Sequence, residues 1–268
     1  MGICLSRAED AVNDFLDSQS RFYKESKQAK EHLEKKKSAE AKSGNSHINA
    51  VFKSELSPIY LSIPKAAKQF HCHHVYDGDT LTLDDGNRVR LLGIDTPELK
   101  EKQPFALEAK EYTKRYCHGK DIWLSFDENT SGEVEKDHYG RLLAFIWVPL
   151  ENNGGKNSKN SSSQWLCINE GIIASGLACA YSPTKTKKVH NYDKLMGLQK
   201  LARVHKLGMW NDFKDYDTIV TPNGSAFHKL NNNKGSDCKH LVRSKNLSVI
   251  KASVAYDRGL HPCRNCLG

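Results

Sequence analysis

The spacing of apolar residues follows two different periods along the chain, one typical of strands and one typical of helices. Between residues 70 and 150 apolar and polar side chains alternate, as in the runs 80–83 and 88–91. Asp85-Gly86 lies between these two runs and is a strong signal for a hairpin turn. Further strands are predicted at 122–126 and 142–148. The pattern therefore predicts a β-hairpin followed by at least two more strands.

Helical periodicity appears between and after these strands. Residues 105–117 have apolar positions at helical spacing and end near Gly119, a suitable C-cap. Similar patterns are found at 165–175 and at 190–206, the latter followed by Gly208. Residues 152–163 are rich in Gly, Asn, Ser and Lys and predict a surface loop. Strands first and helices interleaved later predict an α+β domain built on a small barrel.

The N-terminal region has a different character. Residues 7–43 are charged and contain neither Pro nor Gly, which predicts a weakly amphipathic helix, either a membrane-side stalk or a solvated spacer. Gly2 and Ser6 meet the N-myristoylation pattern, and Cys4 can accept a palmitoyl chain. A second acyl chain makes anchoring stable. We expect attachment to the cytosolic face of the plasma membrane by these lipids, without a transmembrane helix or signal peptide.

Composition narrows the class of protein. The 268 residues carry a net charge of +8, and the mean hydropathy of −0.64 excludes a multi-pass membrane protein. The net charge is +3 for residues 1–69, zero for 70–213 and +5 for 214–268. A neutral central domain must bind any polyanion through a few placed groups. Without a signal peptide, the eight cysteines are expected to be thiols or metal ligands.

Three polar clusters in the central region carry candidate chemistry. They are Asp77-Gly78-Asp79-Thr80, the run from Arg90 to Glu98, and Tyr139-Gly140-Arg141. Asp79, Asp95 and the Thr96 carbonyl can supply the oxygen ligands that Ca²⁺ prefers. Glu98 would lie beside such an ion, and arginine forks suit phosphate. Together these groups are sufficient for phosphodiester cleavage.

The order and spacing of these motifs resemble the staphylococcal nuclease (thermonuclease) family over about residues 70 to 213. The matching segments are Val75-Tyr-Asp-Gly-Asp-Thr, Arg90-Leu-Leu-Gly-Ile-Asp-Thr-Pro-Glu98, His138-Tyr-Gly-Arg141, Asn169-Glu-Gly-Ile-Ile-Ala-Ser-Gly176 and Gly208-Met-Trp210. The resemblance implies a five-stranded OB-fold β-barrel with three packed helices. It also implies Ca²⁺-dependent cleavage of DNA and RNA, preferentially single-stranded, to 3′-phosphorylated products.

The resemblance also implies a role for individual residues. Asp79, Asp95 and the Thr96 carbonyl would bind Ca²⁺, with Asp77 supporting them. Glu98 would be the general base, and Arg90 and Arg141 would hold the scissile phosphate. Tyr139 and Tyr181 would contact the substrate. Because Arg90, Glu98 and Arg141 are all present, an enzyme is favoured over the alternative, a non-catalytic OB-fold module that binds nucleic acid.

The C-terminal region contains Cys238, His240, Cys263 and Cys266, whose spacing predicts a Cys₃His zinc site. His261 is the alternative fourth ligand. The segment resembles the small zinc-binding modules of the Ada type, through Ala255-x-x-x-Gly259-Leu-x-Pro-Cys-x-x-Cys. The predicted organisation is an acylated stalk (1–48), a linker (49–69), the nuclease-like domain (70–213), a second linker (214–236) and a short zinc segment without a core of its own (237–268).

Overall fold

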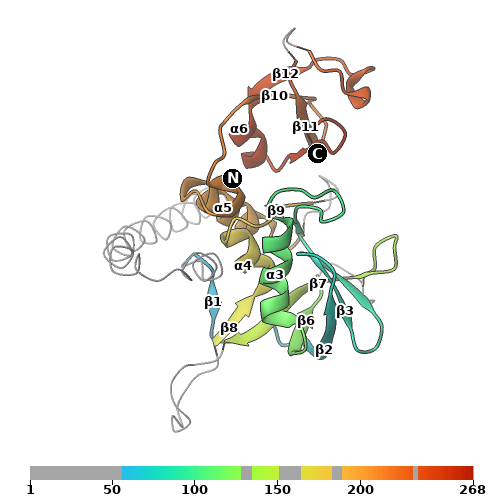
Figure 1. Cartoon of the computed structure of the whole chain (residues 1–268), viewed down its shortest axis with the longest axis vertical. Helices are drawn as coiled ribbons and strands as arrows, with labels where there is room; N and C mark the ends of the chain where they lie inside the picture. The colour runs from blue at the N-terminus through green and yellow to red at the C-terminus, as the bar shows by residue number, and fades with distance from the viewer. Residues whose placement is uncertain (1–55, 128–134, 151–163, 183–188, 232–234, 268) are drawn as a thin grey trace, which may run out of the picture. The chain divides into compact units, whose positions relative to one another are not determined.

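The computed structural model of the chain describes residues 56–127, 135–150, 164–182, 189–231 and 235–267 (Figure 1). The N-terminal stalk, the acylation residues Gly2 and Cys4, and the loop at 152–163 lie outside the described residues. In the described parts of the chain, no helix has both the length and the apolar character needed to cross a bilayer.

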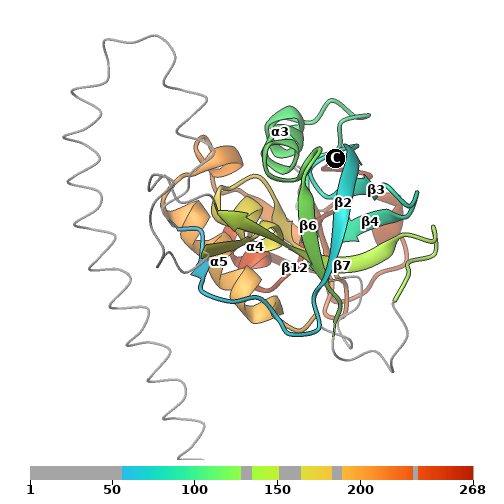
Figure 2. The same cartoon turned by 90° about the horizontal axis from the view of Figure 1, so that it is seen from below.

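The central domain is a closed β-barrel of five strands, as predicted. The strands are β2 (Lys68–Val75), β3 (Thr80–Leu83), β4 (Arg88–Leu91), β6 (Asp121–Ser125) and β7 (Leu142–Leu150). They follow the order β2-β3-β4-β7-β6, and the pairing of β6 with β2 closes the ring (Figure 2). Only the β4–β7 pair is parallel among these five strands. Alternating buried residues along the strands fill the interior.

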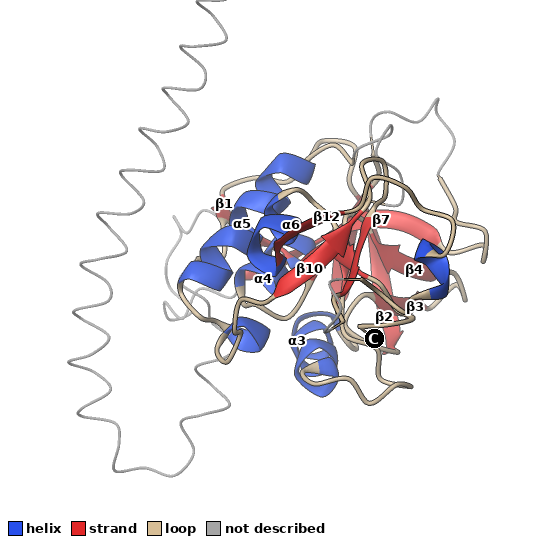
Figure 3. Ribbon diagram, turned by 90° about the horizontal axis from the view of Figure 1, so that it is seen from above, coloured by secondary structure: helices blue, strands red, loops and turns tan. Residues whose placement is uncertain are grey.

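Helices cover the barrel on one side (Figure 3). They are α3 (Ala106–Cys117), α4 (Ile168–Ala174) and α5 (Tyr192–Val204). The helices α4 and α5 pack against each other, and α3 packs against β2. The expected helix at 165–175 is wrong at its start, because residues Gln164–Cys167 form strand β8, which pairs with β7. The predicted α+β class with a barrel and three packed helices is confirmed.

Short elements complete the central domain. Strand β1 (Ile59–Tyr60) pairs with β8, so the expected linker at 49–69 contains paired structure. Strand β5 (Ile94–Asp95) pairs with β9 (Cys179–Ala180), and η1 (Gly208–Trp210) follows α5. The β5–β9 pairing holds Asp95 beside the end of β4.

The buried side chain of Asn169 connects α4 to the barrel. Its Nδ2 donates hydrogen bonds to Leu92 O at 2.8 Å and Ala144 O at 3.1 Å, and its Oδ1 accepts one from the Ile146 N–H at 2.9 Å. The side chain is fully buried. One amide therefore satisfies three backbone groups of two chain segments that water cannot reach.

The C-terminal region folds into a second sheet. It contains β10 (Asp217–Val220), β11 (Ala226–Lys229), β12 (Ser248–Lys251) and β13 (His261–Pro262), in the order β12-β10-β11-β13. Helices η2 (Lys239–Leu241) and α6 (Ala252–Asp257) complete it. The expected linker at 214–236 is thus wrong, because it contains β10 and β11. The segment also has two small apolar clusters, contrary to the expectation that it lacks a core.

Candidate active site and Cys/His cluster

Asp79 connects the first two polar clusters. It follows the turn between β2 and β3, where Gly78 is required because a Cβ there would lie 2.7 Å from the Thr96 side chain. Asp79 Oδ2 accepts hydrogen bonds from the Thr96 backbone N–H at 3.0 Å and from Thr96 Oγ1 at 2.9 Å. Asp77 Oδ1 accepts one from the Asp79 N–H at 3.1 Å. The turn therefore fixes Asp79 against the residue that follows Asp95.

Arg90 bridges the two aspartates. Its Nη2 lies 2.9 Å from Asp95 Oδ1 and 3.2 Å from Asp79 Oδ2. Its Nη1 donates to the carbonyls of Leu91 and Ile94, each at 2.8 Å. Only 13% of the Arg90 side chain is exposed. A lysine could not make these contacts from one planar group.

The carboxylates are close enough to influence each other's ionisation. Burial and the neighbouring Asp79 charge raise the pKa of Asp77 to about 6. Burial also raises the pKa of Asp95 and of Glu98, and in both cases the charge of Asp79 adds to the rise. Burial is thus the main cause of these raised pKa values, and the neighbouring Asp79 charge adds to it.

This donor set fits a hard divalent cation. Asp79 and Asp95 both contact one nitrogen of Arg90, so the two carboxylates lie close to each other. Their ligand atoms are all oxygen, as Ca²⁺ requires, and a bound cation would favour the charged form of Asp95, whose pKa is raised mainly by burial. Asp79, Asp95 and Thr96 are the residues that would hold it.

Glu98 lies at the solvent side of the carboxylate cluster. Its backbone N–H donates to Gln103 Oε1 at 2.8 Å, and its carbonyl accepts from the Gln103 N–H at 3.2 Å. Its side chain is 39% exposed. The backbone is therefore fixed while the carboxylate remains accessible to water and to a substrate.

Arg141 joins the site from the start of β7. Its Nε donates to Asp137 Oδ2 at 2.7 Å, and its Nη1 donates to Thr80 Oγ1 at 3.3 Å. Thr80 Oγ1 in turn donates to Asp79 Oδ1 at 3.0 Å. Burial would raise the pKa of Asp137, but the hydrogen bonds from Arg141 hold this pKa below its usual value. All three polar clusters predicted from the sequence thus meet at one end of the barrel.

The two predicted substrate-contacting tyrosines differ in setting. Tyr139 is 71% exposed, and its ring lies 5.3 Å from the Arg141 guanidinium carbon. Tyr181 follows β9, and its backbone N–H donates to Gly93 O at 2.9 Å. Its ring lies 5.5 Å from that of His261 in the C-terminal segment. Tyr139 thus adjoins an arginine of the site, whereas Tyr181 is close to the C-terminal sheet.

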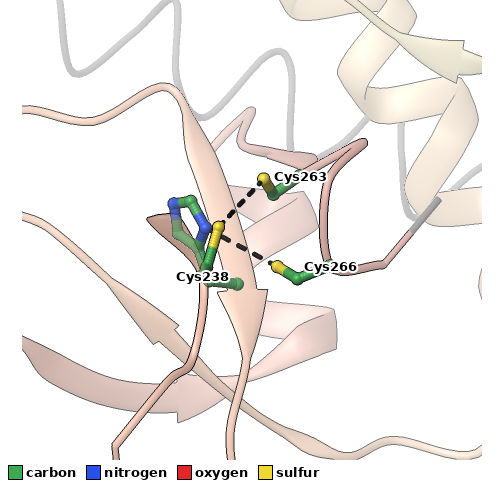
Figure 4. Close-up of side chains that lie close together, drawn as sticks. Cys238, Cys263 and Cys266 are labelled. Atoms are coloured by element: carbon green, nitrogen blue, oxygen red, sulfur yellow. Dashed lines mark hydrogen bonds between the residues drawn. The ribbon is translucent and has the colours of Figure 1, made fainter. Parts of the chain in front are cut away.

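A separate cluster of metal-ligand types lies in the C-terminal segment (Figure 4). The ligand atoms of His228, Cys238, Cys263 and Cys266 all lie within 4.8 Å of one another, and no other group of three or more Cys, His, Asp or Glu in the described ranges does so. The Sγ atoms of Cys238 and Cys263 are 3.7 Å apart, and Cys266 Sγ is 3.8 Å from His228 Nδ1. A Cys₃His set suits tetrahedral Zn²⁺.

The prediction that His240 is the fourth ligand is wrong, and so is the alternative prediction of His261, because His228 lies with the three cysteines. His240 is exposed outside the cluster, and the His261 ring lies against Tyr181. His228 was missed because it falls on β11, in the stretch expected to be a linker. No sequence signal was available, because Ala226-Phe227-His228-Lys229 does not alternate between apolar and polar residues. Backbone and thiol hydrogen bonds outweigh burial and lower the pKa of Cys238, which favours a metal-binding thiolate.

Comparison with known proteins agrees with this geometry. A five-stranded barrel with this strand order is typical of an OB-fold, and the acids and arginines gathered on it suit chemistry on phosphodiesters. Residues 88–212 match the family model for "Staphylococcal nuclease homologue". The thermonuclease of Staphylococcus hyicus is 31% identical over 147 residues, which cover 52% of this chain and 73% of that protein.

Two further relatives extend the comparison. A micrococcal nuclease of Shigella flexneri is 30% identical over 145 residues, covering 52% of this chain and 71% of the relative. The SPbeta prophage-derived endonuclease YokF of Bacillus subtilis is 32% identical over 142 residues, covering 50% of this chain and 41% of the relative. The chain belongs to the staphylococcal nuclease family, and the prediction of a hydrolytic nuclease is confirmed.

Proposed function

We propose that the protein is a Ca²⁺-dependent endonuclease that hydrolyses DNA and RNA to 3′-phosphorylated products. The observation that carries this proposal is Arg90 bridging Asp79 and Asp95. Arg141 is linked to the same pair through Thr80. Two arginine forks and a cation-binding carboxylate pair thus lie within one hydrogen-bonded network, with Glu98 accessible beside it. A module that only binds nucleic acid has no use for this combination.

The chain's own groups account for each requirement of the reaction. Arg90 and Arg141 bind the scissile phosphate and stabilise the charge that develops on its oxygens. Glu98, whose raised pKa brings it closer to neutrality, accepts a proton from the attacking water. The new bond joins the water oxygen to phosphorus. The bond from phosphorus to the 5′ oxygen breaks, and this oxygen leaves as a hydroxyl after taking up a proton from solvent, to which Glu98 returns the proton that it accepted. Bound Ca²⁺ would supply Lewis-acid stabilisation of the phosphoryl oxygens.

Substrate binding is proposed to rely on placed groups, because residues 70–213 have no net charge. The exposed Tyr139 ring beside Arg141 is suited to contact a nucleotide, and Tyr181 is proposed as a second contact. Aromatic stacking reaches only unpaired bases. This supports a preference for single-stranded DNA and RNA.

The Ca²⁺ assignment can be tested by titration. Asp95→Asn removes one ligand charge, so we expect the Ca²⁺ concentration for half-maximal cleavage to rise at least about tenfold. The measurement is cleavage of labelled single-stranded DNA across a Ca²⁺ series, with an EGTA baseline. Asp84→Asn, an exposed acid beyond the end of β3, is the matched control and should leave the midpoint unchanged. Equal midpoints for wild type and Asp95→Asn would remove Asp95 from the metal site.

We further propose that His228, Cys238, Cys263 and Cys266 bind a structural Zn²⁺. The Lys229 N–H donates to Cys266 Sγ at 3.4 Å, which would support a coordinating thiolate. Metal analysis of the purified full chain should find about one zinc per molecule. Cys263→Ser should lose it, and Cys179→Ser, a thiol of β9 outside the cluster, should retain it. Zinc retained by Cys263→Ser would contradict this site.

Membrane attachment is proposed to depend on acylation at Gly2 and Cys4, with the protein on the cytosolic face of the plasma membrane. The pattern Met-Gly-Ile-Cys-Leu-Ser supports this, since both acceptor residues are present. Gly2→Ala should move the protein from the membrane to the soluble fraction, because it removes the myristoyl acceptor. Fractionation of expressing cells measures this, with Gly44→Ala as control. Unchanged membrane association of Gly2→Ala would refute myristoyl anchoring.

A further inference from the structure

Arg264 reaches from the Cys/His cluster to the candidate active site. It lies in the Cys263-Arg-Asn-Cys266 turn, between two of the proposed zinc ligands. Its Nη2 is 3.5 Å from each carboxylate oxygen of Asp95 and 3.6 Å from Glu98 Oε1. A third arginine, 166 positions from Glu98 along the chain, therefore faces the proposed metal ligand and the proposed base.

The turn that carries Arg264 is held by its own hydrogen bonds. The backbone N–H groups of Cys266 and Leu267 donate to Cys263 O at 3.2 and 2.9 Å. The Cys263 N–H donates to Phe227 O in β11 at 2.9 Å. Arg264 therefore projects from a fixed backbone and not from a free tail.

The C-terminal segment is also fixed against the central domain. Arg203 of α5 pairs with Asp257 at 2.5 Å, and the Tyr256 ring lies 4.9 Å from that of Trp210. Gln199 Nε2 donates to Tyr256 O at 3.4 Å. These contacts are made by α5, η1 and α6 and involve none of the proposed catalytic groups. They would hold the cysteine turn in place when the Arg264 side chain moves.

The Arg264 contacts themselves are weak. Its side chain is 65% exposed, and ion pairs of such exposed groups contribute little to stability because water screens them. By contrast, Arg90 is largely buried and has shorter contacts. Arg264 can therefore exchange its carboxylate contacts for an incoming phosphate at little cost, and its planar fork suits that partner.

We propose that Arg264 is a substrate-binding residue that contacts a backbone phosphate next to the scissile one. This inference rests on the proposed nuclease activity. Residues 214–268, which have a net charge of +5, would thereby contribute one positive group to the candidate active site. The central domain at 70–213 has no net charge of its own. The Cys/His cluster positions Arg264, because it fixes the turn on both sides of it.

The test compares Arg264→Ala and Arg264→Lys with Arg243→Ala, an exposed arginine of the same segment, all in the full chain. At saturating Ca²⁺, Arg264→Ala should raise KM for a labelled single-stranded oligonucleotide about tenfold and change kcat less than threefold. Because one phosphate contact is lost, the slope of the logarithm of the binding constant against the logarithm of the salt concentration should become shallower by about 0.7. Arg264→Lys should have a KM between those of the wild type and Arg264→Ala. Arg243→Ala should have the KM of the wild type.

Two results would overturn the inference. One is unchanged KM and salt dependence in Arg264→Ala. The other is a lower Ca²⁺ midpoint with unchanged KM, which would make Arg264 an inhibitor that competes with the metal. If the wild type cleaves nothing, the proposed function fails. The inference can then still be tested by binding. Fluorescence anisotropy compares the oligonucleotide affinity of Glu98→Ser with that of the double variant Glu98→Ser and Arg264→Ala. Equal affinities would reject the inference.

Discussion

Replacing Arg141 with lysine is expected to lower kcat for phosphodiester cleavage about 10²- to 10³-fold. Lysine keeps the charge but cannot contact Asp137, Thr80 and a phosphate with one planar fork. Removing one preformed donor from a charge-stabilising site typically costs this factor. The measurement is single-turnover cleavage at saturating Ca²⁺, which separates the chemical step from binding.

Arg88→Lys is the matched control for that experiment. Arg88 is an exposed arginine on β4, two residues before Arg90, and its guanidinium lies over Tyr76. In the part of the chain that the structure describes, Arg88 forms no ion pair with the acids of the site, and its replacement should change the rate less than twofold. A loss below about threefold in Arg141→Lys would show that positive charge alone suffices, contrary to the role given to the arginine fork.

Asn169→Ala is expected to lower the free energy of unfolding by about 3–4 kcal/mol. The change deprives the Leu92 carbonyl and the Ile146 N–H of their Asn169 hydrogen bonds, while the Ala144 carbonyl loses one bond and keeps that from the Leu92 N–H at 2.9 Å. Each unsatisfied buried group costs about 1–3 kcal/mol, partly relieved by relaxation or water entry. Urea denaturation followed by tryptophan fluorescence measures the difference.

Two variants sharpen the Asn169 test. Asn169→Asp keeps the shape but cannot donate to the two carbonyls, so it should be at least as destabilising as alanine. Asn211→Ala removes an exposed amide that donates a hydrogen bond to its neighbour Asp212 and should change stability by less than about 0.5 kcal/mol. A loss below 1 kcal/mol in Asn169→Ala would mean that the three hydrogen bonds are replaced easily.

Alternation and apolar runs were sufficient to predict β3, β4, β6 and β7, whereas β2, which carries three histidines and a cysteine at 71–74, was not predicted. The hairpin at 80–91 is the clearest case, since Asp85-Gly86 allows the tight reversal and Gly86 has φ of +82°. The helix at 105–117 was also predicted correctly. The strand β8 was not, because the short apolar run at 165–167 has no period that separates a strand from a helix.

The larger omissions arise from contacts between distant segments. His228 and Arg264 have no local pattern that marks them, since each gains its significance from a partner far along the chain. The strands β10 and β11 are only four residues each, and they flank a turn rich in polar residues, so the stretch was interpreted as a linker. The meeting of Asp79, Asp95 and Arg141 was predictable only through the family resemblance, because spacing alone does not bring three chain segments together.

The most direct test of the proposed function is product analysis. A defined single-stranded oligonucleotide is incubated with wild type and with Glu98→Ser, in Ca²⁺ and in EGTA, and the fragments are identified by mass spectrometry. We predict internal cleavage to fragments with 3′-phosphate and 5′-hydroxyl ends by the wild type in Ca²⁺ alone, with at least a hundredfold slower reaction for Glu98→Ser. Intact substrate with the wild type in Ca²⁺, or equal cleavage by Glu98→Ser, would contradict the proposal.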